Sequence, residues 1–362
     1  MIDEVADDLG LSSAAAGLLT SAPILCFGLL APVAPVLARR LGAERVLLLA
    51  LFPLVAGTLV RGESSAAALF AGTLLAGAAI AVANVVVPSI VKGRFAERAG
   101  RLMGIYVAAL GAGAAIAAGL TVPVEEALEA GWEAGLAVWA IPAALAAVIL
   151  GVAVARGGSR VTGRGGPGDA RALLGDGLAW QVTLFFGLQS ILFYIALTWL
   201  PSILREDGYG AREAGALLAL FALGGIPASL VVPIVATRMR DQRAIAVGVA
   251  ALEAAAVAGL LAAPAAAAVW VTLFALGQGA AFSLALTLIV LRAPDSRRAA
   301  ELSGMAQAIG YTLAAAGPLG VGALHDWSGG WDAPLAALLL MTVPLLAAGL
   351  LAGRAATVRP SL

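Results

Sequence analysis

The sequence predicts an all-α membrane protein made of two pseudo-symmetric six-helix bundles, with the first helix missing. Three observations support this fold class. Hydrophobic residues make up 61% of the chain and charged residues 12%, whereas a soluble domain is roughly 45 to 50% apolar and about 25% charged. Apolar segments of membrane-spanning length recur along the whole chain. Finally, part of the first half of the sequence reappears in the second half.

The apolar segments predict eleven transmembrane helices. A helix needs about 20 mostly apolar residues to cross the hydrocarbon core of a bilayer, and Gly, Pro and clustered charges divide the chain into segments of about this length. The predicted helices are 13–38, 45–59, 66–91, 102–122, 136–155, 180–204, 214–237, 244–262, 266–291, 300–324 and 334–353.

An internal repeat relates the two halves. Residues 9–46 match residues 207–244 at a shift of 198 positions, with Gly, Pro and Arg residues in register: Gly17 with Gly215, Pro35 with Pro233, Arg40 with Arg238, and Arg45 with Arg243. A second match, at a shift of 200, aligns Arg98, Ala99, Leu102 and Gly104 with Arg298, Ala299, Leu302 and Gly304. The chain is therefore expected to be two copies of one unit.

The repeat also predicts that one helix is missing. Helix 180–204 opens the second copy, and its counterpart in the first copy would end near Met1. Two equal halves of six helices would make twelve, so we expect that an N-terminal helix is lost by truncation, a late start codon or deletion. The predicted organisation is an N-terminal bundle of five helices at 1–155, a cytoplasmic linker at 156–178 and a C-terminal six-helix bundle at 179–362.

Charge placement predicts the orientation of the helices. All but three of the 22 Lys and Arg residues fall on one side of the alternating topology; the exceptions are Arg61, Arg205 and Arg212. By the positive-inside rule this side is cytoplasmic, which also places the C-terminus in the cytoplasm. We therefore expect a multi-pass protein of the inner (plasma) membrane.

Other function classes lack sequence support. The net charge is zero and Cys26 is the only cysteine, so neither nucleic-acid binding nor a cysteine metal cluster is expected. Gly111 to Gly113 and the pair Gly317 and Pro318 lie in apolar spans without a preceding strand, and are better explained by close packing or bending than by phosphate binding. No catalytic constellation is visible, so we expect neither an enzyme nor a cofactor nor a metal.

The loop at residues 35–44 carries a degenerate form of a known signature. The pattern Gly-x-Leu-Ala-Asp-Arg-x-Gly-Arg-Arg maps onto this loop with Pro35 in place of the Gly and Arg39 in place of the Asp. With the parallel repeat and the long linker, the chain resembles the major facilitator superfamily. The resemblance implies a solute site near the midplane between the two halves. It also implies that the gating salt bridge attributed to the Asp cannot form in its usual way.

The second half is similar to one branch of that superfamily, the cyanate and nitroimidazole transporters of the CynX/NimT type. The runs that carry this similarity are 187–194, 198–201, 277–279, 284–288, 302–307 and 324–326. The resemblance implies a secondary transporter that moves a small polar or anionic solute, either cyanate-like or a nitroaromatic heterocycle, by alternating access. A non-transporting membrane sensor and a truncated, inactive transporter remain as alternatives. The expected partners are the solute, the lipid bilayer and a proton as candidate coupling ion, with no nucleic acid.

Polar side chains inside the apolar spans are the candidate solute ligands, because such residues are costly and often line a pathway. The resemblance implies a cavity lined by helices 66–91, 180–204 and 266–291 and by the missing helix. Gln189 and Tyr194 are expected to form hydrogen bonds to a small polar or planar ligand, with Trp199 or Phe193 as an apolar wall. For Gln189 and Tyr194 a contact between helices is the alternative, and for Gln307 and Tyr311 a polar contact between the halves. For Asn84 the alternative is a bond to a backbone carbonyl that Pro88 leaves free. The predicted solute-binding residues are Asn84, Gln189, Tyr194, Trp199, Gln278, Gln307 and Tyr311.

Two titratable residues need a separate interpretation. Glu253 is the one acidic residue in the middle of a span, and is thus the visible candidate for proton coupling. The corresponding helix is peripheral in the superfamily, so a Glu that packs between helices or lies at the lipid edge is the favoured alternative. His325 is the single histidine, and we interpret it as a capping or interfacial group.

Overall fold

The computed structural model describes residue 5 and residues 8–11, 13–127, 131–157 and 170–360. Throughout these ranges the regular elements are α-helices and short 3-10 helices, and no strand occurs. The prediction of an all-α protein is confirmed. Most of the predicted linker, residues 158–169, lies outside the described residues.

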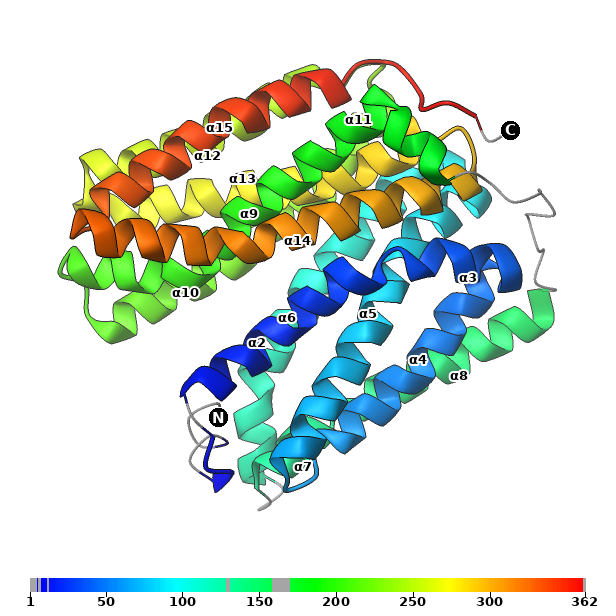
Figure 1. Cartoon of the computed structure of the whole chain (residues 1–362), viewed down its shortest axis with the longest axis horizontal. Helices are drawn as coiled ribbons and strands as arrows, with labels where there is room; N and C mark the ends of the chain where they lie inside the picture. The colour runs from blue at the N-terminus through cyan, green and yellow to red at the C-terminus, as the bar shows by residue number, and fades with distance from the viewer. Residues whose placement is uncertain (1–4, 6–7, 12, 128–130, 158–169, 361–362) are drawn as a thin grey trace.

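Each half is a bundle of long helices (Figure 1). The helices of the first half are α2 (Ser13–Leu30), α3 (Val33–Leu41), α4 (Ala43–Val60), α5 (Ala66–Arg94), α6 (Ala99–Ala127), α7 (Trp132–Ala137) and α8 (Ala140–Gly157). Those of the second half are α9 (Gly177–Glu206), α10 (Ala211–Gly224), α11 (Ile226–Arg238), α12 (Arg243–Ala262), α13 (Ala267–Arg292), α14 (Ser296–Ser328) and α15 (Asp332–Ala352).

Nine helical segments in the described ranges are long and apolar enough to cross a membrane, or up to ten if the bent pair α2 and α3 forms one span. Two of the nine join two α-helices, α7 with α8 and α10 with α11, and two others begin with a short 3-10 helix. The 33-residue helix α14 is not among the nine, although it contains the predicted helix 300–324. Every predicted segment is therefore helical, and nine or ten of the eleven meet this criterion.

Two of the predicted helices are broken. The predicted helix 13–38 bends by 55° between α2 and α3, and Pro32 lies at the bend. The predicted helix 214–237 is interrupted between α10 and α11, where Pro227 lies in the first turn of α11. Proline has no backbone N–H to donate and clashes with the preceding turn, so a helix tends to end before it. The two breaks occupy similar places in the two copies of the repeat.

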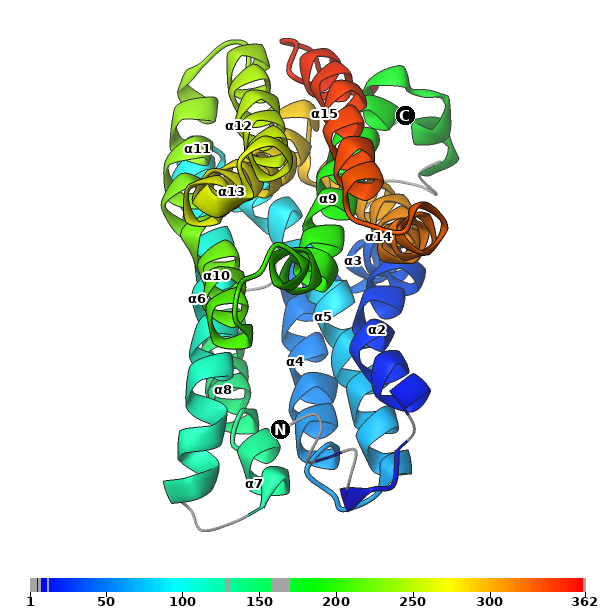
Figure 2. The same cartoon turned by 90° about the vertical axis from the view of Figure 1, so that its left-hand side faces the viewer.

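The two halves pack against each other through α2 and α5 against α14, and through α6 against α11. In both views the second half lies above the first (Figures 1 and 2). Contacts between halves are close where α3 meets the start of α14: a Cβ added at Gly304 would lie 2.8 Å from Cγ of Pro35. Toward the start of α2 and the end of α14 the halves diverge (Figure 1).

The two ends of the molecule differ in charge. We call the end with Arg39, Arg94 and the start of α14 the basic end. The opposite end, where α9 finishes at Glu206 and α15 begins at Asp332, is called the acidic end. The halves meet at the basic end and separate toward the acidic end.

The second half holds the larger core. Phe185 and Phe186 of α9 and Phe274 of α13 are among its largest fully buried side chains. Helices α11 and α13 approach so closely that a Cβ added at Gly225 would lie 2.7 Å from the carbonyl oxygen of Ala275. Small residues allow such approach between membrane helices, where packing replaces the hydrophobic effect as the main source of association.

Candidate functional site

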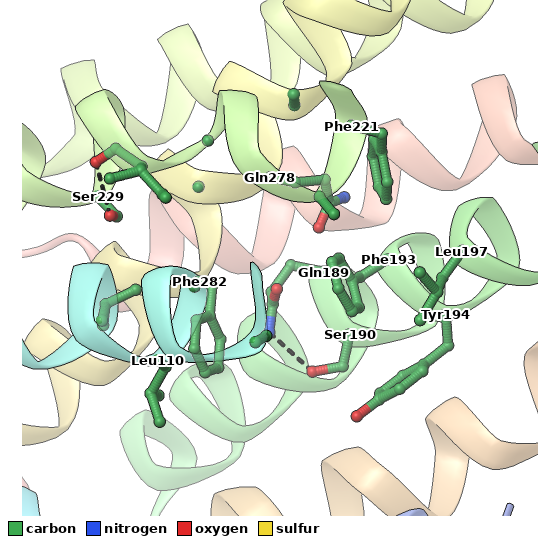
Figure 3. A pocket seen from close by; sticks show the side chains of 18 of the residues that line it. Leu110, Gln189, Ser190, Phe193, Tyr194, Leu197, Phe221, Ser229, Gln278 and Phe282 are labelled. Carbon is green, nitrogen blue, oxygen red and sulfur yellow. Dashed lines mark hydrogen bonds between the residues drawn. The ribbon is translucent and has the colours of Figure 1, made fainter. Parts of the chain in front are cut away.

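A cavity of about 340 Å³ lies where α6 of the first half faces α9, α10, α11 and α13 of the second half (Figure 3). Small-molecule sites commonly range from about 300 to 1,000 Å³. Most of the lining is apolar. The polar residues in it are Gln189, Ser190, Tyr194, Ser229, Gln278 and Tyr311.

Gln189 contributes an oriented amide from α9. Its Nε2 donates to the carbonyl oxygen of Phe186 at 2.9 Å and to Oγ of Ser190 at 2.7 Å. Ser190 in turn donates to the same carbonyl at 2.8 Å. These bonds hold the amide nitrogen against α9, so its oxygen is turned toward the cavity and Gln278 (Figure 3). Gln189 thus offers a fixed acceptor to a bound solute.

Gln278 contributes a second amide from the opposite wall, on α13. Its Nε2 donates to Oε1 of Glu253, on α12, at 3.1 Å. Its Oε1 is buried and has no hydrogen-bond partner in the described part of the chain. In Figure 3 this oxygen points toward the side of the cavity that carries Gln189. A buried acceptor without a partner costs free energy until a donor reaches it.

Aromatic rings form much of the remaining wall. Phe193 stacks on Phe221 with ring centroids 5.7 Å apart, and Tyr194 meets Tyr311 at 6.4 Å in an edge-to-face arrangement. Tyr311 also lies 5.3 Å from Phe27 of α2, so this ring connects the cavity to the first half. Such contacts between rings restrict their motion and favour flat ligands that can lie against a ring face.

The electrostatic character of the site follows from its lining. Within the described part of the chain, the side chains that line the cavity include no Asp, Glu, Lys, Arg or His. A solute held here would be recognised by amide, hydroxyl and aromatic groups, without a neutralising ion pair. The carboxyl group of Glu253 lies behind this wall, where it accepts a hydrogen bond from Gln278.

The structure places four of the seven predicted residues at the cavity. Gln189, Tyr194, Gln278 and Tyr311 line it. The other three, Asn84, Gln307 and Trp199, do not.

Asn84 and Gln307 connect helices. Tyr106 donates its hydroxyl to Oδ1 of Asn84 at 2.7 Å, so the side-chain oxygen of Asn84 is satisfied within the first half. Gln307 Nε2 donates to Oγ of Ser303 at 2.9 Å and to the backbone oxygen of Asn84 at 3.3 Å. Gln307 therefore makes a polar contact between the halves, which was the alternative interpretation for this residue, with the backbone oxygen of Asn84 as acceptor.

Trp199 supports the packing of α9 against α14. Its indole Nε1 donates to the carbonyl oxygen of Pro318 at 2.9 Å. Its ring lies 5.4 Å from that of Trp331. His325 is next to this pair, with its ring 4.2 Å from Trp331 and its Nε2 3.7 Å from Oε2 of Glu206. This location at the acidic end fits the interpretation of His325 as an interfacial group.

Glu253 lies in a contact between two helices. The favoured sequence interpretation put it at the lipid edge or in helix packing. Its residue surface is 0% exposed, which excludes the lipid edge, and it bonds to the cavity-lining Gln278. Helix α12 packs on α13 and α15, and Glu253 lies on the side that faces α13. The packing of the Glu between helices, one of the two favoured alternatives, is what the structure shows.

Several lining residues were missed from sequence, including Ser190, Ser229, Phe221 and Phe282. For Phe282 a signal existed, because it lies four residues after Gln278 and therefore on the same helix face. The serines gave no such signal, since their short side chains often bond to their own helix, as Ser229 does to the carbonyl oxygen of Ile226.

Comparisons with known proteins agree with this architecture. Residues 1–318 match the family model of the Major Facilitator Superfamily. The chain is 38% identical over 366 residues to the 2-nitroimidazole transporter of Escherichia coli (strain K12), which covers 99% of this chain and 91% of the relative. It is 29% identical to the cyanate transport protein CynX of the same organism, over 89% of this chain and 83% of the relative.

Among solved structures, the fold is similar to the E. coli fucose:proton symporter FucP, with a TM-score of 0.74 and 12% identity over 96% of this chain and 93% of that one. The predicted similarity to the cyanate and nitroimidazole transporter branch is confirmed. The helix pattern, the fold and the family match lead to one conclusion. The chain is a multi-pass membrane transporter that belongs to the major facilitator superfamily.

Proposed function

We propose that the protein is a secondary transporter that moves a small, planar, polar solute across the inner membrane by alternating access. A nitroaromatic heterocycle is the leading solute class and a cyanate-like anion the second. The observation that carries the proposal is the cavity itself, in which the amides of Gln189 and Gln278 face each other between aromatic walls.

The chemistry of the lining favours the heterocycle. A flat ring can lie against Phe193, Tyr194 or Phe282, and a ring N–H can donate to an amide oxygen. Hydroxyl groups of Tyr194 and Tyr311 can donate to nitro oxygens. Cyanate has three heavy atoms and a full negative charge, and the lining offers it no cation. The likeness to the 2-nitroimidazole transporter over nearly the whole chain gives independent support.

Alternating access is supported by the contrast between the two ends. The halves touch at the basic end, where Arg39 pairs with Glu301, and they diverge at the acidic end (Figure 1). We assign the basic end and the C-terminus to the cytoplasm, following the positive-inside rule. In this assignment the structure corresponds to an outward-facing state, and transport requires the halves to rock about the central site.

The first experiment measures solute flux. The purified protein is reconstituted into proteoliposomes, and uptake of 2-nitroimidazole and of cyanate is followed with and without a proton gradient. We expect 2-nitroimidazole to be taken up in preference to cyanate. Gln189→Leu removes one cavity acceptor, so uptake at limiting solute should fall about 5- to 150-fold, which corresponds to about 1 to 3 kcal/mol for a group whose partner is left unsatisfied.

Gln181→Leu is the matched control. Gln181 is on the same helix, two turns before Gln189, and accepts from Arg354 at 2.9 Å outside the cavity. This variant should transport as the wild type does. An equal loss of uptake in Gln189→Leu and Gln181→Leu would contradict the assignment of Gln189 to the cavity. Solute binding without any flux in the wild type would favour the alternative of a non-transporting membrane sensor.

A further inference from the structure

Glu253 and Gln278 form an isolated polar pair inside the second half. Glu253 is 0% exposed and Gln278 is 4% exposed. One bond joins them, from Gln278 Nε2 to Glu253 Oε1 at 3.1 Å. The other oxygen of each group, Oε2 of Glu253 and Oε1 of Gln278, is buried without a partner in the described residues. This one pair of residues therefore contains two buried oxygen atoms that lack a hydrogen-bond partner.

No charge in the described helices balances a carboxylate at this position. Glu253 has no ion pair. The helices packed against it carry charged groups at their ends: Arg243 begins α12, Arg292 ends α13 and Asp332 begins α15. Arg243 is ten residues from Glu253, or roughly 15 Å along the helix. An unpaired buried carboxylate costs several kcal/mol, which favours a proton on this group.

The charge of Glu253 determines how the Gln278 amide can be oriented. A carboxylate only accepts hydrogen bonds, so it requires the amide nitrogen to face it, and the cavity then meets the amide oxygen. This is the arrangement in the structure (Figure 3). A carboxylic acid can donate its O–H to the amide oxygen. Turning the amide over then directs its NH₂ group into the cavity.

We propose that Glu253 is the proton-binding site of this transporter and that its proton sets whether Gln278 presents an acceptor or a donor to the solute. The proton comes from water and forms an O–H bond on Oε2 of Glu253, and no other covalent bond changes. The hydrogen bond from Gln278 Nε2 to Glu253 is exchanged for one from this O–H to Oε1 of Gln278. A solute that presents an acceptor to α13, such as a nitro oxygen or a ring nitrogen, is bound together with one proton. Because binding linkage is reciprocal, such a solute also raises the proton affinity of Glu253.

This proposal rests on the proposed function, and its test separates the two. Binding of 2-nitroimidazole to the purified protein is measured in weakly buffered solution with a pH indicator. At a pH at which Glu253 is mostly ionised, the wild type should take up about one proton for each solute bound, and solute affinity should fall as the pH rises. Glu253→Gln should bind solute with no proton uptake and with a pH-independent affinity.

Ser283→Ala is the matched control. Ser283 is on α13, is fully buried and bonds to the carbonyl oxygen of Ala280, outside the cavity. It should keep the proton uptake of the wild type. In proteoliposomes, Glu253→Gln should still exchange labelled for unlabelled solute but should not accumulate it when a proton gradient is applied.

A second measurement uses the wild-type protein alone, so its result does not depend on whether a variant folds. Difference infrared spectroscopy of the wild type should show a carboxylic acid carbonyl band that grows when solute is added. Proton uptake that is unchanged in Glu253→Gln, or an infrared spectrum without such a band, overturns the proposal. If the wild type binds no 2-nitroimidazole, the proposed function fails, whereas a pH titration of the same infrared band without solute still tests the proton site.

Discussion

Arg39 of α3 and Glu301 of α14 form an ion pair between the two halves, with Nη1 and Oε1 3.8 Å apart. Glu301 is also held by Arg298 at 2.7 Å and by Arg297 at 3.3 Å, and its side chain is 1% exposed. Arg39 occupies the signature position at which the superfamily pattern has Asp. With Arg at this position, the salt bridge attributed to that Asp cannot form. The ion pair that joins the halves at this end instead has its basic residue, Arg39, on the first half and its acidic residue, Glu301, on the second.

Arg39→Gln should weaken the closed basic end. The Arg39 side chain is 28% exposed, and pairs of this kind contribute about 0.2 to 1 kcal/mol. The ratio of closed to open molecules at the basic end should therefore fall by up to about fivefold. Distances between spin labels placed on the two halves at this end measure the ratio directly. Arg40→Gln, one position along, should leave it unchanged, and equal shifts in both variants would argue for a general charge effect.

Gly104→Ala should disturb the contact between α6 and α11. A Cβ at this position would lie 2.8 Å from the carbonyl oxygen of Leu230, in the other half. Backbone cannot move aside as easily as a side chain, so the helices must separate and the closed basic end should lose about 1 to 3 kcal/mol. Thermal unfolding and the same spin-label distances measure this loss.

Gly113→Ala is the control on the same helix. A Cβ at Gly113 would meet nothing within 4 Å, and Ala favours a helix over Gly by up to about 1 kcal/mol. This variant should be as stable as the wild type or slightly more so. If Gly104→Ala were also as stable as the wild type, the close approach of α6 and α11 would not be required for stability or for closure of the basic end.

The fold was largely predictable because its signals are local or periodic. Applying the shift of 198 to Ser13, the start of α2, gives residue 211, where α10 starts. The breaks within two predicted helices were missed, although Pro32 and Pro227 lie at them. An apolar span longer than 20 residues does not show by itself whether a proline only bends the helix or ends it.

The site was predictable in part, for a geometric reason. Polarity inside a span identified Gln189 and Gln278, which line the cavity. It identified Asn84 and Gln307 equally, which instead make the contact between halves. Helical periodicity gives the face of each residue within its own helix, but not the rotation of one helix relative to another. For the same reason, the contact between Glu253 and Gln278 could not be read from the sequence.

Asp207 provides a prediction on pH and stability at the acidic end. Partial burial, together with the nearby carboxylates of Glu206 and Asp332, raises the pKa of Asp207 above its ordinary value. The folded protein thus binds this proton more tightly than the unfolded chain does, so stability falls as the pH rises from the ordinary pKa through the raised one. Asp207→Asn removes this cost and should raise the unfolding temperature at neutral pH.

The gain from Asp207→Asn should disappear in acid, where the wild-type carboxyl is already protonated. Unfolding temperatures measured between pH 3 and pH 8 test this expectation. Glu63→Gln removes the same negative charge from the exposed loop after α4. It should not raise the unfolding temperature at neutral pH. A gain for Asp207→Asn that persisted in acid would point to a cause other than the charge.

Gln307 and Gln278 should respond differently to the same substitution. Gln307→Leu removes the donor to the backbone oxygen of Asn84, which is a bond between the halves. A neutral hydrogen bond contributes about 0.5 to 1.5 kcal/mol, so the closed-to-open ratio at the basic end should fall about 2- to 13-fold. Gln278→Leu removes a cavity amide and should lower solute affinity by a similar factor while leaving that ratio unchanged.

The two readouts are the spin-label distances between halves and the dissociation constant of 2-nitroimidazole. In Gln307→Leu the dissociation constant should change only as far as the population of the binding-competent state changes. This separation follows from location, because Gln307 lies outside the cavity lining and Gln278 lies within it. If Gln307→Leu lowered affinity without moving the halves, Gln307 would have to contact the solute in a state that differs from this structure, and the predicted role as a ligand would be restored.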